Sequence, residues 1–127
     1  MIDHSTTTAE AQSDTGGNYN HGGDLIYRFG NPNTYNSLGN KIFDKNHFPN
    51  LLEDGVPGEG NVLVYVNGNS TEQSVIYELA MPSNFGLESN FNNEPNIVWS
   101  YLNDEIHSDK LCGAIRLPNG NTVITES

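Results

Sequence analysis

The residues of this chain that could do chemistry are few, and their spacing excludes several common kinds of site. The 127 residues include four histidines and a single cysteine, Cys112. No Cys/His array has zinc-site spacing, and nothing adjacent to Cys112 would lower the pKa of its thiol. The carboxylates of Glu53, Asp54 and Glu59 surround a Gly/Pro turn, but the ligand spacing of an EF-hand is absent. The histidines and arginines therefore remain as the main candidates.

The charge balance excludes two classes of partner. Five basic and sixteen acidic residues give a net charge of 5 − 16 = −11 at pH 7. Nucleic-acid binding and polybasic membrane-surface binding both depend on Lys and Arg meeting phosphates. No stretch approaches the roughly 20 apolar residues that span a bilayer. We therefore expect no nucleic acid and no membrane among the partners.

The elements that must position any site are predicted to be β-strands. Apolar clusters rich in β-branched and aromatic residues are bounded by Gly, Pro and Asn, which is typical of turn-rich β structure. No window of a dozen residues has an uninterrupted helical stripe, so helices are expected to be minor. Six strands are predicted, with a weaker seventh near residues 47–52; the six are 25–29, 62–66, 74–79, 97–101, 113–117 and 122–125.

Turns and long connections separate these strands. Residues 68–72 and the turn Pro118-Asn119-Gly120 each predict a hairpin, because Asn-Gly tolerates positive φ. The stretches 1–23, 30–46 and 83–94 are polar and long for a compact domain. Loops of this length are often functional or disordered.

The chain also contains a loose internal repeat. Residues 23–29 resemble residues 95–101, since both are polar-led strands with aromatic ends. Residues 60–64 resemble residues 120–124, since both begin with Gly-Asn followed by an apolar strand. Recurrence of this kind is typical of the four-stranded antiparallel blades of a β-propeller.

The repeat predicts an all-β fold, a partial β-propeller of about two blades. Residues 23–29 would be the outer strand of one blade, 47–101 one complete blade, and 112–126 the start of the next. Propellers typically need 4–8 blades to close and remove their sheet edges. We therefore expect either a fragment of a longer protein or an assembly of copies. A small β-sandwich made from the same seven strands is the alternative.

Four blocks of sequence together resemble the bacterial arylsulfotransferases (aryl-sulfate sulfotransferases). The resemblance implies a six-bladed propeller with its active site at the central channel. It implies PAPS-independent transfer of a sulfuryl group from an aryl sulfate to a phenolic acceptor, with no cofactor. It also implies a periplasmic or secreted location, with any export signal upstream of Met1. The blocks are residues 3–11, 22–32, 57–68 and 116–122.

The resemblance further implies a histidine that carries the sulfuryl group. The matching place is Asn46-His47, thirteen residues before Gly60, and His47 is therefore the predicted nucleophile. A neutral imidazole nitrogen can attack sulfur and leave again, which divides one displacement into two easier ones. Asn46 stands where the family has Gln, and residues 48–51 also depart from the family pattern.

Three further residues are predicted to bind substrate. His4 would face the channel, Arg116 would meet a sulfate oxygen, and Asn50 would lie beside the nucleophile. The alternative for Arg116 is an ion pair with a carboxylate such as Glu126 or Asp104. The expected partners are a small aryl sulfate and a phenol, together with the remaining blades or a second copy joined through exposed sheet edges. The competing function is a propeller that binds or scaffolds without catalysis.

Overall fold

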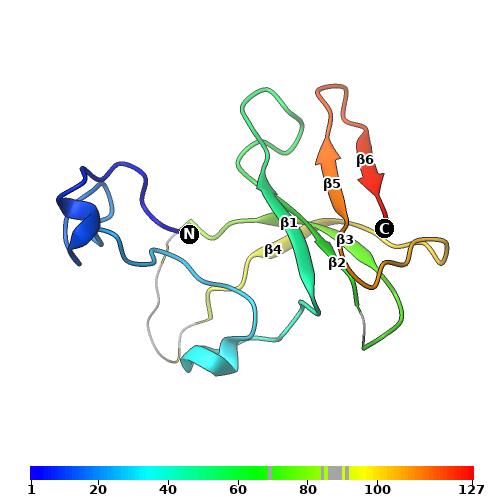
Figure 1. Ribbon diagram of the computed structural model, residues 1–127, viewed down its shortest axis with the longest axis horizontal. Coiled ribbons are helices and arrows are strands. Elements are labelled where there is room, and N and C mark those ends of the chain that lie inside the picture. Colours follow the sequence, from blue (N-terminus) through cyan, green and yellow to red (C-terminus); the bar gives the residue numbers. More distant parts are fainter. Residues whose placement is uncertain (69, 84, 86–89, 91) are drawn as a thin grey trace. The chain divides into compact units, whose positions relative to one another are not determined.

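The computed structural model describes residues 1–127 except 69, 84, 86–89 and 91. The described residues form two compact units (Figure 1). The first unit comprises Met1–Lys41 and Ser83–Glu94, and the second comprises Ile42–Pro82 and Pro95–Ser127. The six β-strands of the described residues all lie in the second unit.

A four-stranded antiparallel sheet forms most of the second unit (Figure 1). Its strands follow chain order, β1-β2-β3-β4, and each pairs with the next. The four strands expected between residues 47 and 101 are confirmed, including the weaker first one. Their bounds are β1 Asn46–Leu51, β2 Val62–Val66, β3 Val75–Ala80 and β4 Asn96–Tyr101.

The last two strands form a separate hairpin. β5 (Gly113–Arg116) and β6 (Thr122–Thr125) pair antiparallel in a regular register. The turn is closed by the Leu117 amide, which donates to the Asn121 carbonyl at 2.8 Å. Gly120 has φ +87°, a conformation that favours glycine. The hairpin predicted at Pro118-Asn119-Gly120 is thus confirmed.

The hairpin covers one face of the four-stranded sheet, and the core lies between the two. β5 contacts β1 and β2. Tyr65 and Ile76 are opposite each other in the register and are fully buried, as is Leu63. Ala114 of β5 completes this cluster. Full burial of each large apolar side chain contributes about 1.5–3 kcal/mol, so this contact is the main source of stability in the second unit.

The first unit corrects one prediction. Residues 23–29 were expected to include an outer blade strand at 25–29, but within the described residues only Leu25 takes part in β pairing, through a single bridge to Ile2. The adjacent Ile26 amide donates to the Met1 carbonyl at 3.0 Å. A β-branched and aromatic sequence becomes a strand only where a neighbouring strand pairs with it. Here the paired neighbour is two residues long.

The rest of the first unit is built from turns and two short 3₁₀ helices. These are η1 (Glu10–Gln12) and η2 (Pro32–Tyr35). The buried Tyr27 side chain anchors the unit, because its hydroxyl donates to the Asn93 carbonyl at 2.9 Å. Burial raises the pKa of Tyr27 well above its ordinary value. The predicted long connections 1–23 and 30–46 are therefore ordered by local turns; part of the third, 83–94, lies outside the described residues.

Candidate functional site

His47, the predicted nucleophile, lies on the edge strand β1 of the four-stranded sheet. It is half-buried and stands opposite Tyr65 in the register. In the part of the chain that the structure describes, its imidazole makes no hydrogen bond. The register shifts directly after it, between His47 and Asn50, where Phe48 adopts a left-handed φ of 49°. A bulge of this kind locally re-aims side chains and is over-represented next to active sites.

A groove of about 290 Å³ begins at the residue after His47. Its walls come from β1, the β1–β2 connection and β5, and they include Phe48, Leu51, Ile115 and Arg116. The Phe48 ring lies close above Gly113, where an added Cβ would be only 3.2 Å from the ring. The lining is mainly apolar, so the groove can accept a flat hydrophobic group.

Asn50 lies in this wall and its amide is used within the protein. Its Nδ2 donates to the Ala114 carbonyl at 3.0 Å and to the Phe48 carbonyl at 3.1 Å, with a longer contact of 3.4 Å to the Leu63 carbonyl. These acceptors belong to β1, β2 and β5. Asn50 therefore ties the bulge to the hairpin, and its predicted contact with substrate stays a prediction.

Arg116 is held in a buried ion pair with Glu78 of β3. Its Nη2 lies 2.8 Å from the Glu78 carboxylate, and the two side chains are only 9% and 7% exposed. Its Nε donates to the Thr122 hydroxyl at 2.8 Å, and its guanidinium lies over the Trp99 ring at 5.1 Å. A sulfate oxygen would have to compete with Glu78 for this cation.

The sequence prediction overlooked Glu78, which is the centre of this polar cluster. Besides Arg116, its carboxylate accepts a hydrogen bond from Asn61 Nδ2 at 2.7 Å. Buried carboxylates of this kind need a partner, because desolvating an unpaired charge is costly. A sequence signal existed: Glu78 is the lone charge in an otherwise apolar strand. Trp99, expected to pack between blades, packs against the core cluster beneath the hairpin.

His4 belongs to the first unit and is exposed. The preceding residue, Asp3, is buried and organises the loop around it. Its carboxylate accepts hydrogen bonds from the Ser5 hydroxyl at 2.7 Å, the Ser5 amide at 2.8 Å and the Tyr19 amide at 3.0 Å. These bonds, those of Ser5 foremost, lower the pKa of Asp3. The predicted role of His4 toward substrate stays a prediction.

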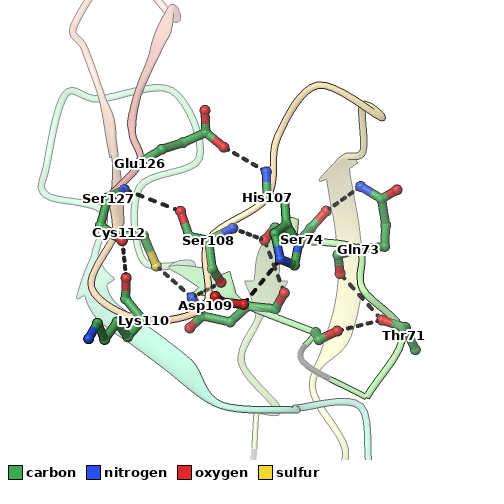
Figure 2. A network of polar contacts seen from close by, with 12 residues as sticks. Thr71, Gln73, Ser74, His107, Ser108, Asp109, Lys110, Cys112, Glu126 and Ser127 are labelled. Atoms are coloured by element: carbon green, nitrogen blue, oxygen red, sulfur yellow. Dashed lines mark hydrogen bonds and ion pairs between the residues drawn. The ribbon is translucent and has the colours of Figure 1, made fainter.

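A second polar network lies at the opposite end of the sheet from the β1–β2 connection (Figure 2). The Ser74 hydroxyl donates to the Asn67 carbonyl and accepts from the Ser108 amide, both at 3.0 Å. Asn67 Nδ2 also lies 3.6 Å from the sulfur of Cys112. Burial raises the pKa of the Cys112 thiol, an effect larger than that of the Asn67 contact. The network fixes the loop before β5, and Cys112 has no thiolate character.

Two searches over the described residues gave no candidates. Those residues hold no group of three or more His, Cys, Asp or Glu side chains placed to bind a metal ion. They also contain no helix with the length and apolarity needed to cross a membrane.

Comparisons with protein-family models, with curated proteins and with solved structures gave no significant match for this chain.

Proposed function

We propose that this chain supplies adjacent blades of a sulfuryl-transferring β-propeller of the arylsulfotransferase type. The supporting architecture is the chain-ordered antiparallel sheet β1–β4, followed directly by the hairpin β5–β6 on its face. Stacking of successive antiparallel sheets face to face is how propeller blades share their cores. In this interpretation residues 46–101 are one blade, and β5 and β6 are the first strands of the next.

The state of His47 is the observation that carries the functional proposal. β1 is the first strand of the sheet, and in a propeller the first strand of a blade lines the central channel. The ring on this strand is half-exposed and makes no hydrogen bond to the described residues. A nucleophile requires both properties, because its attacking nitrogen must be reachable and must carry a free electron pair.

The proposed chemistry proceeds in two balanced displacements. An imidazole nitrogen of His47 attacks the sulfur of an aryl sulfate, a nitrogen–sulfur bond forms, and the aryl oxygen leaves with the electron pair as a phenolate. The oxygen of a second phenol, losing its proton to the medium, then attacks sulfur and the nitrogen–sulfur bond breaks. The free imidazole returns and an aryl sulfate is released. The apolar groove beside Phe48 would hold the aryl ring.

The test is a transfer assay with p-nitrophenyl sulfate and a phenol. We expect phenol-dependent release of p-nitrophenolate from the unmodified chain and at least a hundredfold slower release from His47→Ala, by analogy with loss of a covalent catalyst. His21→Ala replaces an exposed histidine of the first unit and serves as the matched control. Release that His47→Ala leaves unchanged would contradict the proposal.

The second candidate is a propeller module that binds without catalysis. The geometry of Arg116 favours it, because the guanidinium that was predicted to meet sulfate is paired with Glu78. Sulfuryl transfer needs positive charge or hydrogen-bond donors on the sulfate oxygens. The assay separates the two functions: aryl sulfate that binds without any p-nitrophenolate release would favour the binding module.

A further inference from the structure

The edge strands of the second unit differ in how they are protected against pairing with another chain. β1 carries a bulge and Pro49, and β4 carries a bulge at Val98, where Trp99 and Ile97 pair with successive residues of β3. Bulges and prolines on edges prevent edge-to-edge association. These two edges of the four-stranded sheet are therefore blocked.

β6 has none of these protections. Its four residues, Thr122–Thr125, include no charge and no proline, and they pair with β5 without a register shift. Figure 1 shows β6 as the outer strand of the hairpin. Within the described part of the chain, no backbone hydrogen bond reaches β6 from the side opposite β5. A regular, uncharged edge of this kind is a template for a further strand.

The outward face of the hairpin is apolar as well. Ile115 and Val123 stand directly opposite each other in the register, and they are 50% and 46% exposed. A two-stranded sheet is marginal by itself, and strands added to it extend both the hydrogen bonding and the apolar face.

We propose that β6 pairs antiparallel with β6 of a second copy of the chain, about a two-fold axis at Val123. A two-fold axis perpendicular to the sheet keeps each side chain on its own face, so a residue must face itself or a residue an even number of positions away. With Val123 facing its counterpart, Ile115 and Val123 of both copies form one apolar row across four strands. The second copy fits because β6 brings no charge to the contact. This inference does not depend on the chemistry at His47.

The net charge of −11 on each copy opposes this association at long range. Salt screens such repulsion, with a Debye length of about 10 Å at 0.1 M and about 3 Å at 1 M. The dimer should therefore tighten as salt is added, which is the reverse of an association held by ion pairs.

Sedimentation velocity over a concentration series, at low and high salt, tests the proposal. The chain should shift from monomer to dimer with concentration, and at least tenfold more tightly in high salt. Val123→Lys should remain monomeric throughout. Val98→Lys, which places the same charge at a 53% exposed position on β4, should dimerise like the parent. A parent that stays monomeric, or a dimer that Val98→Lys abolishes and Val123→Lys spares, would overturn the proposal.

Cysteine cross-linking checks the register separately. In a Cys112→Ser background, Val123→Cys should form an intermolecular disulfide on mild oxidation, because facing residues of an antiparallel pair have Cα atoms about 4.5–5.5 Å apart. Thr125→Cys would face Asn121 of the partner subunit and lie too far from its own counterpart to be bridged. Equal cross-linking of both variants would refute the register and with it the Val123-centred axis.

Discussion

Arg116 and Glu78 form an ion pair that joins the hairpin to the four-stranded sheet from beneath. The positive charge of Arg116 suggested a sulfate contact, with an ion pair to Glu126 or Asp104 as the alternative. The ion pair is present, but its carboxylate belongs to Glu78, 38 residues earlier in the chain. The sequence alone could not single out this partner, because strand register and sheet packing decide which carboxylate is buried beside the guanidinium.

Removing the cation from this pair should destabilise the second unit strongly. Arg116→Met leaves the Glu78 carboxylate buried with only the Asn61 amide, and we expect a loss of about 3–5 kcal/mol in the free energy of unfolding. Urea unfolding measures it. The double variant Arg116→Met with Glu78→Met should regain part of the loss, since it removes both charges together. A loss below about 1 kcal/mol, typical of a surface pair, would show that the pair is not buried in solution.

Asp3 should make the stability of the first unit depend on acid pH. Its pKa is lowered in the folded chain, chiefly by the Ser5 hydrogen bonds. Its contribution is therefore complete above the ordinary carboxyl pKa and is lost as pH falls through the lower folded value. We expect the unmodified chain to exceed Asp3→Asn in stability at pH 7, and this advantage to vanish in strong acid. Asp14→Asn, at an exposed position, should show no such pH-dependent difference.

At the scale of elements, the strands that pair with their sequence neighbours were predictable and the unpaired segment was not. The runs in β2 and β3 alternate along buried, β-branched positions, and a short turn joins them. Residues 25–29 have the same composition, yet only Leu25 finds a β partner. Composition reports what a segment would do beside a neighbouring strand, whereas the presence of that neighbour is a property of the whole chain. The bulge after His47 was likewise invisible, because Phe48 gives no sequence sign of its positive φ.

The connection between β1 and β2 provides a test of how closely the chain packs over Glu78. Gly58 has φ +89°, and an added Cβ there would collide with the Glu78 carboxylate. Gly55 has a similar φ of +82° but open space around it. Gly55→Ala should lose only the cost of a left-handed alanine, about 1–2 kcal/mol. Gly58→Ala should lose clearly more in urea unfolding, and equal losses would contradict the packing described here.

At the scale of the whole molecule, the all-β class was predictable from composition, and the sheet order followed from the spacing of the strands. The propeller remains a proposal, supported by the stacking of β5–β6 on β1–β4. The division into two units was not foreseen, because the polar stretches that build the first unit look like connections in the sequence. Their order comes from side-chain contacts such as those of Asp3 and Tyr27, which leave no periodic pattern.

The most direct measurement of the central claim is the intact mass of the chain after brief exposure to p-nitrophenyl sulfate without an acceptor. The account predicts a gain of one sulfuryl group, accompanied by one equivalent of p-nitrophenolate, that maps to His47 and disappears when a phenol is added. His47→Ala should gain nothing, while His21→Ala should gain the group as the unmodified chain does. No mass gain, or a gain that His47→Ala retains, would contradict the claim that this imidazole accepts the sulfuryl group.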